Sequence, residues 1–231
     1  MVHVYANRPV GQTHVGRALD RRLLSRRTCQ AFRDIRGLAA AAVLDAIDAA
    51  RDAGVADPLV VDVGAGPAPY VLDALSARPT ARAVLLDIDP HAVRAAAREA
   101  ERRGLGTRVA CAVADAFDVA ALGAGYPRPD IVLELGLYGI YHDDQRVADH
   151  ILGLGDHVRP SQIVCNVQVR NPEIEYIARV WRNHAGGPCV WRLRPASAIL
   201  EWMAAAGYAP ASITQDRHGI YRVMRLVRHV A

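Results

Sequence analysis

The sequence predicts an α/β fold built on a mostly parallel sheet. From about residue 57 onward, short runs rich in β-branched apolar residues alternate with longer segments of helical periodicity. This alternation is typical of a parallel sheet with helices on both faces. The first run, 59–63, leads into Gly64 and Gly66, and the second run, 82–87, ends in an aspartate. A glycine turn after one strand and an acid after the next is how such sheets bind a ligand at their carboxyl edge.

A helical extension over residues 1–56 precedes the sheet. We expect residues 1–10 to be loose and two helices to follow, over 16–27 and 28–53, because apolar residues recur there at helical spacing. Arginines cluster at 21–27. This cluster either attracts an acidic partner or forms a solvated helix face, and the second interpretation is favoured.

Residues 57–231 are predicted to form the second domain. Five strand–helix units come first, and the chain then closes with a hairpin that makes the sheet seven-stranded and Rossmann-like. We expect strands over 59–63, 82–87, 108–113, 130–135, 161–168, 208–215 and 219–228, helices over 69–77, 90–103, 144–158, 172–184 and 195–206, and a short strand or extended segment over 189–193.

Composition narrows the functional class. The chain has 231 residues, of which 52% are hydrophobic, and a net charge of +4. Every Lys or Arg position is an arginine, and most arginines are interleaved with acids, which argues against a nucleic-acid partner. No apolar run reaches the length of a membrane span, and the first residues lack the apolar core of a signal peptide. We therefore expect a cytoplasmic protein without a membrane partner, as a monomer or a homodimer.

The four cysteines do not suggest a metal site. Cys29, Cys111, Cys165 and Cys189 are scattered, without a paired spacing and without nearby histidines at zinc-ligand intervals. We expect them to be small core residues and expect no metal cofactor.

The glycine turn and the acid after the second strand have distinct roles. Gly64 permits a sharp turn, and Gly66 has no Cβ, so a flat or charged ligand can approach the backbone. Asp87 follows the glycines by about 20 residues, the distance at which related folds place an acid against a ribose diol. Asp89 before Pro90 is better explained as a helix N-cap. The alternative for this stretch is a tight strand-to-helix turn that binds nothing.

Four short motifs follow one another along the predicted sheet: 62–68 (Asp-Val-Gly-Ala-Gly-Pro-Ala), 86–90 (Leu-Asp-Ile-Asp-Pro), 114–117 (Ala-Asp-Ala-Phe) and 129–134 (Pro-Asp-Ile-Val-Leu-Glu). They resemble the motifs of class I S-adenosylmethionine-dependent methyltransferases over about residues 58–230. The likeness is strongest to a bacterial subgroup whose members are sometimes fused to an α/β-hydrolase. The third small position of the glycine motif is Ala68 followed by Pro69, which counts against a dinucleotide motif.

The resemblance implies S-adenosylmethionine as the cofactor. Asp87 would bind the ribose hydroxyls and Asp115 the adenine amino group, while Phe117 would either stack on the adenine or serve as an ordinary core aromatic. It also implies that the N-terminal helices form a lid, in which Gln30, Arg33 and Arg36 either contact the methionine carboxylate or are purely structural. The cofactor residues that we predict are Asp62, Gly64, Ala65, Gly66, Asp87, Ile88, Asp115, Ala116, Phe117 and Glu134.

The predicted reacting end lies after the fourth strand. Tyr138 and Tyr141 are suited to stabilising a sulfonium cation with their ring faces. His142 is the candidate base if the acceptor must lose a proton, and Glu134 is the second candidate. A lone histidine is more often a surface or cap residue, so a non-catalytic His142 stays open.

Three functions are compatible with this pattern. The first is a methyltransferase acting on a small molecule, in specialised metabolism. The second is an enzyme that uses S-adenosylmethionine without methylating, either by cyclising it to azetidine-2-carboxylate with release of methylthioadenosine or by aminocarboxypropyl transfer. The third is a scaffold that keeps the fold without turnover, which the intact acids and glycines argue against.

Overall fold

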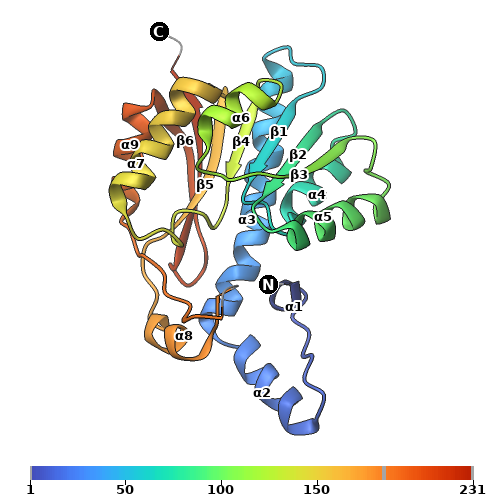
Figure 1. The fold of residues 1–231 in the computed structure, drawn as a ribbon, viewed down its shortest axis with the longest axis vertical. Helices are drawn as coiled ribbons and strands as arrows, with labels where there is room; N and C mark the ends of the chain where they lie inside the picture. The colour runs from blue at the N-terminus through green and yellow to red at the C-terminus, as the bar shows by residue number, and fades with distance from the viewer. Residues whose placement is uncertain (1, 184–185, 230–231) are drawn as a thin grey trace.

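The computed structural model describes residues 2–183 and 186–229, which form a seven-stranded sheet between two layers of helices (Figure 1). The strand order is β3-β2-β1-β4-β5-β7-β6. Neighbours from β3 to β5 are parallel, whereas β7 is antiparallel to both β5 and β6. The strands are β1 (Leu59–Val63), β2 (Arg82–Asp87), β3 (Val109–Val113), β4 (Ile131–Glu134), β5 (Gln162–Gln168), β6 (Tyr208–Gln215) and β7 (Tyr221–Arg228).

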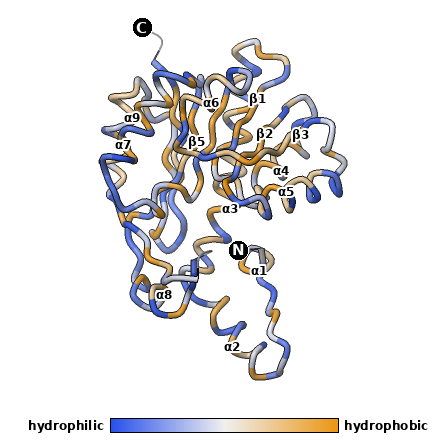
Figure 2. The backbone as a smooth tube through the Cα atoms, viewed as in Figure 1, coloured by the Kyte–Doolittle hydropathy of each residue, from blue (hydrophilic) through white to orange (hydrophobic). Residues whose placement is uncertain are grey.

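Each face of the sheet buries its own core. Val60 belongs to the core under α3, α4 and α5, whereas Val61 and Val63 belong to the core under α6, α7 and α9. In Figure 2 the central strands are mostly coloured as hydrophobic, as expected for parallel strands covered on both faces. The helices of these layers are α3 (Arg27–Asp52), α4 (Pro69–Ala77), α5 (Pro90–Arg102), α6 (Val119–Gly125), α7 (Asp144–Gly153) and α9 (Ala196–Ala205).

The predicted fold class is confirmed, including the antiparallel C-terminal hairpin. The strand order changes direction between β1 and β4, because β2 and β3 lie on one side of β1 while β4 and β5 lie on the other. In such sheets ligands bind at this switch point, beyond the carboxyl ends of the strands. In Figure 1 these ends face the lower part of the molecule, where α1 (Val2–Tyr5), α2 (His14–Leu24) and α8 (Ile174–Val180) also lie.

The N-terminal region differs from the prediction in two respects. A short helix, α1, forms where loose chain was expected, because Val4 is buried against Leu24 and Cys29. The helix expected over 16–27 is α2, which begins earlier because the Thr13 hydroxyl caps it by accepting the Gly16 N–H at 3.0 Å. It also ends sooner, at Leu24, with Ser25 as its C-cap.

Four later elements also differ. Helix α6 was not predicted, since its seven residues are mostly Ala and Gly and carry no apolar period. The helix expected over 144–158 is α7 followed by a π-helical turn, η1 (Leu154–Val158). The helix expected over 172–184 is shorter, and residue 184 lies outside the described residues. The segment 189–193 forms no strand; the nearest pairing is an isolated bridge between Arg182 and Pro188.

Candidate functional site

The turn between β1 and α4 has the backbone that its sequence requires. Gly64, Gly66 and Ala68 all have positive φ, at 73°, 55° and 44°. Ala68 immediately precedes Pro69, which occupies the first turn of α4. A Cβ built on Gly66 would have no other atom within 4 Å, so the space above this backbone is open. The turn therefore presents main-chain groups to the carboxyl edge of the sheet.

Asp87, at the end of β2, is tied to this turn. One carboxylate oxygen accepts the Gly66 N–H at 2.8 Å, and the other accepts the Asp89 N–H at 2.9 Å. Asp89 in turn caps α5 by accepting the His91 N–H at 2.8 Å, as predicted. Ile88 between them is 62% exposed, an unusual position for a large apolar side chain. The β2 end thus offers a carboxylate and an apolar face side by side.

Asp62, in the middle of this edge, is the most unusual group of the site. Its side chain is fully buried, and neither carboxylate oxygen has a hydrogen-bond partner among the described residues. Burial raises the pKa of Asp62 well above its usual range, and the nearby Asp87 and Glu134 carboxylates add to this shift. The Tyr70 hydroxyl opposes the shift because it lies close to the carboxylate, although the two do not meet hydrogen-bond geometry. Because buried polar groups are almost always paired, this carboxylate is suited to a donor that a ligand supplies.

The turn after β3 carries Asp115, Ala116 and Phe117. Asp115 is exposed and accepts the Phe117 N–H at 2.9 Å, while Ala116 is buried. The Phe117 ring lies 4.1 Å from the Tyr141 ring and 4.6 Å from the His150 ring, measured between centroids. Phe117 is therefore held in a cluster of rings at the carboxyl end of β3.

Glu134, at the end of β4, is buried like Asp62 but fully paired. It accepts a hydrogen bond from the Tyr138 hydroxyl and is bonded to Nε2 of His150. Burial by itself lowers the pKa of His150, but the Glu134 carboxylate, with a smaller contribution from Asp115, outweighs it, so this pKa lies above its ordinary value. Burial and the same carboxylate raise the pKa of Tyr138. The structure thus brings Glu134 and Tyr138 together and adds a histidine that the sequence did not single out.

The loop between β4 and α7 places the other predicted residues. Tyr141 is partly buried against Phe117, whereas His142 is exposed, with Nε2 3.3 Å from the Val190 carbonyl. Asp143 caps α7 by accepting the Gln145 N–H at 2.9 Å. The structure therefore keeps the exposed His142 apart from the buried Glu134 and Tyr138.

Arg194 fixes this loop, and no local pattern in the sequence indicated it. Its side chain is buried and donates to the carbonyls of Tyr138 and Tyr141, the latter at 2.8 Å, and to Asp144 at 2.9 Å. Because the partners are some 50 residues away in sequence, only the tertiary structure reveals this role.

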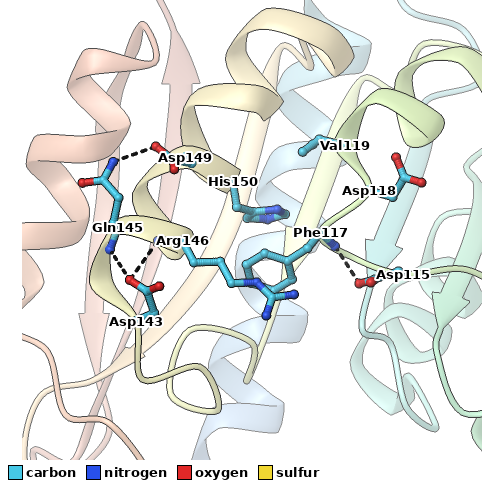
Figure 3. Close-up of a pocket in the computed structure, with 9 residues that line it drawn as sticks. All are labelled: Asp115, Phe117, Asp118, Val119, Asp143, Gln145, Arg146, Asp149 and His150. Carbon is cyan, nitrogen blue, oxygen red and sulfur yellow. Dashed lines mark hydrogen bonds between the residues drawn. The ribbon is translucent and has the colours of Figure 1, made fainter.

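A cavity of about 600 Å³ lies between the β3–α6 turn and α7 (Figure 3). The Arg146 guanidinium lies 4.6 Å from the centre of the Phe117 ring and 4.9 Å from that of Tyr141. In Figure 3 Arg146 lies across the Phe117 ring and His150 lies on the wall behind it. The lining residues are Asp115, Phe117, Asp118, Val119, Asp143, Gln145, Arg146, Asp149 and His150.

The N-terminal residues predicted to contact the methionine group have other partners. Arg36 pairs with Asp73 through Nε at 2.9 Å and Nη2 at 2.7 Å. Arg33 donates to the Leu24 carbonyl at 3.0 Å, and Gln30 donates to the Ser25 carbonyl at 2.6 Å. Tyr5 is partly buried; burial raises its pKa to about 12, and the Asp62 carboxylate adds to this. An aromatic residue of α1 therefore lies near the centre of the site.

Two further properties concern the part of the chain that the structure describes. It contains no group of three or more His, Cys, Asp or Glu side chains placed to hold a metal ion. It also contains no helix with the length and hydropathy needed to span a bilayer.

Comparison with known families now identifies the chain. Residues 1–228 match the sequence model of a family described as "Putative methyltransferase". The chain belongs to this family. The predicted resemblance to class I methyltransferases is thereby confirmed, and the methyltransferase family match agrees with the glycine turn and acids described above.

A curated relative and two solved structures are similar to the chain. The "Uncharacterized protein YnbC" of Escherichia coli (strain K12) is 30% identical over 229 residues, which are 98% of this chain and only 39% of that protein. A possible exported protein from Bordetella parapertussis has a TM-score of 0.77 at 18% identity, covering 99% of this chain and 78% of that one. Magnesium protoporphyrin IX methyltransferase from Synechocystis PCC 6803, with bound SAH, has a TM-score of 0.67 at 16% identity, covering 88% of each chain.

Proposed function

We propose that this protein is an S-adenosylmethionine-dependent methyltransferase that acts on a small molecule. The observation that carries the proposal is the unpaired, fully buried carboxylate of Asp62 beneath an open glycine turn. Of the ligands that a methyltransferase of this fold binds, S-adenosylmethionine carries a cationic amino group, and an ammonium would satisfy that carboxylate. The scaffold alternative gives no reason to keep such a group buried.

The site residues fit the parts of this cofactor in chain order. Asp87 would accept from the ribose hydroxyls, since a carboxylate can accept two adjacent donors. Ile88 would cover one face of the adenine. Asp115 would accept from its amino group, with Ala116 and Phe117 beside it. The backbone of Gly64, Ala65 and Gly66 would lie along the methionine part.

When bound, S-adenosylmethionine supplies a methyl group on an already activated sulfonium. The chain then has to align the acceptor with that methyl and exclude water. Tyr141 offers a ring face at the mouth of the site, and the exposed His142 is placed to take a proton from an incoming acceptor. Glu134 and Tyr138, which are bonded to each other, would shape this loop rather than meet the acceptor.

We also propose that α1 and α2, the first part of the 1–56 extension, act as a lid, as the family resemblance implied, whereas α3 packs against the sheet as part of its core. Helices α1 and α2 lie below the carboxyl ends of the strands (Figure 1), and Tyr5 lies near Asp62. Closure over this edge would keep water from the sulfonium.

A small-molecule acceptor is favoured because arginines around the sheet are neutralised by ion pairs with aspartates. Four arginines pair with aspartates: Arg36, Arg78, Arg103 and Arg194. These four therefore do not contribute to a free basic surface of the kind that binds nucleic acid. The similar structure from Synechocystis is named for a small-molecule substrate, magnesium protoporphyrin IX.

The test is product analysis by mass spectrometry. The purified protein is incubated with S-adenosylmethionine alone and with a panel of small-molecule acceptors. S-adenosylhomocysteine that forms only with an acceptor supports the proposal. Methylthioadenosine formed without an acceptor would instead support the non-methylating alternative, and no binding by calorimetry would support the scaffold.

Asp87→Ala tests the proposed contact between this carboxylate and the ribose. It should weaken cofactor binding by about 1–3 kcal/mol, because ribose hydroxyls would lose their acceptor. An unchanged dissociation constant in calorimetry would remove Asp87 from the site.

A further inference from the structure

His150 has no role in the function proposed above, although it lines the cavity beside Asp115 and Phe117. It projects from α7 and is 2% exposed. Nε2 is bonded to Glu134, while Nδ1 is buried without a hydrogen-bond partner among the described residues. Such a histidine is rigidly placed, because its ring can turn only by breaking the bond to Glu134.

The imidazole lies against the residue that would flank the adenine. Its centroid is 4.6 Å from that of Phe117, with a 37° angle between the rings. Tyr141 contacts Phe117 at 4.1 Å, and the Arg146 guanidinium lies 4.6 Å from the Phe117 centroid. In Figure 3 His150 and Arg146 lie on opposite sides of Phe117. Phe117 lies in a turn, outside the regular backbone of a strand or helix. Its ring is therefore held in place by these three neighbouring side chains.

The charges around His150 come from three elements. Glu134 reaches it from β4, Asp115 lies beyond the end of β3, and Arg146 is one turn away on α7. The Tyr138 hydroxyl shares Glu134, and the Cys165 thiol of β5 lies near the same carboxylate. Burial and Arg146 lower the pKa of His150, but the Glu134 and Asp115 carboxylates together outweigh them. The pKa is therefore raised, and the imidazole is cationic further into the neutral range than a free histidine. A cation beside an aromatic ring attracts it.

We propose that His150, anchored by Glu134, is a positioning residue that holds Phe117 in place for the adenine of the cofactor. This inference rests on the proposed function and deepens it. It assigns the hydrogen-bonded pair of Glu134 and His150 to recognition of the adenine, at a distance from the methyl group. The His150 imidazole acts through Phe117, so it influences affinity for the nucleoside and leaves the methionine part untouched.

The first test measures binding of methylthioadenosine to the wild-type protein by calorimetry between pH 6 and pH 9. This probe lacks the amino-acid group, so it carries no ammonium whose contact with Asp62 would add a pH dependence of its own. Affinity should fall by about two- to tenfold as His150 loses its proton, the range expected for one ring contact. A constant affinity over this range would overturn the proposal, and this test needs no variant.

The second test is a double-mutant cycle with His150→Gln and Phe117→Leu. Glutamine keeps a neutral donor for Glu134 and does not titrate. His150→Gln should weaken methylthioadenosine binding and abolish its pH dependence, but should add nothing once Phe117 is leucine. Additive losses would show that His150 does not act through Phe117. His157→Gln, an exposed position on η1, is the control and should bind as the wild type does.

The outcomes separate the two proposals. If the wild-type protein binds neither S-adenosylmethionine nor methylthioadenosine, the proposed function itself fails. If it binds both with an affinity that is independent of pH and of His150, only the present inference fails.

Discussion

Two buried carboxylates lie at the ends of neighbouring strands, and the protein treats them in opposite ways. Asp62 on β1 and Glu134 on β4 both have fully buried side chains, and Asp62 is in register with Leu133, the residue before Glu134. Glu134 is bonded to Tyr138 and His150. Asp62 has no hydrogen-bond partner among the described residues.

The comparison separates a structural acid from one that is ready for a ligand. A buried charge is tolerated when it is paired, so Glu134 belongs to the framework of the site. An unpaired one lowers the stability of the folded state, and a protein gains from keeping it only where a ligand completes it. Burial alone, which the two acids share, would not have distinguished them.

The largest expected effect is that of Glu134→Ala on stability. Removing the carboxylate leaves the His150 imidazole and the Tyr138 hydroxyl buried without an acceptor. We expect the free energy of unfolding in urea to fall by about 3–5 kcal/mol. Glu175→Ala, which removes an exposed partner of Arg179, is the control and should change stability by less than about 0.5 kcal/mol. A loss below about 1 kcal/mol for Glu134→Ala would contradict the conclusion that Glu134 is the structural acid of the two.

Asp62→Asn should have the opposite sign for stability. The raised pKa of Asp62 means that the folded protein holds a proton that the unfolded chain releases above about pH 4. Wild-type stability therefore falls as pH rises from there towards the raised pKa, and the asparagine variant lacks this fall. At pH 7 we expect the variant to be more stable by about 1–3 kcal/mol in urea.

The same variant should bind S-adenosylmethionine more weakly, by about tenfold or more, because the ammonium loses a charged acceptor. Methylthioadenosine, which lacks that group, serves as the control ligand and should bind unchanged. A variant that is less stable than the wild type at pH 7, or that keeps its full affinity for S-adenosylmethionine, would contradict the role given to Asp62.

Arg36→Met is expected to have the smallest effect. Arg36 and Asp73 are both about one-third exposed, so their ion pair should contribute about 0.2–1 kcal/mol. Cofactor affinity should stay the same, since Arg36 already has a partner outside the site. A clear loss of affinity in calorimetry would restore Arg36 as a ligand of the methionine group and move the centre of the site away from Asp62.

Local sequence determined the strands, the glycine turn and the caps. β-branched runs, positive-φ glycines and the pairs Asp89-Pro90 and Asp143-Asp144 each act within a few residues, so their structure could be predicted directly. The same reasoning missed α1 and α6. Helix α1 depends on the packing of Val4 against Leu24 and Cys29, and α6 depends on the cap from Asp118, rather than on any apolar period.

In the candidate site, too, some features follow from local sequence and others only from tertiary contacts. The sequence by itself determined that Asp62, Asp87, Asp115 and Glu134 lie at the carboxyl ends of strands, because parallel strands bring their ends to one edge. Only the tertiary structure decided which acid is paired, since the partners of Glu134 come from the next loop and from the second turn of α7. Side-chain contacts across the fold carry no local signature. The roles of His150 and Arg194 therefore emerged only from the packed molecule.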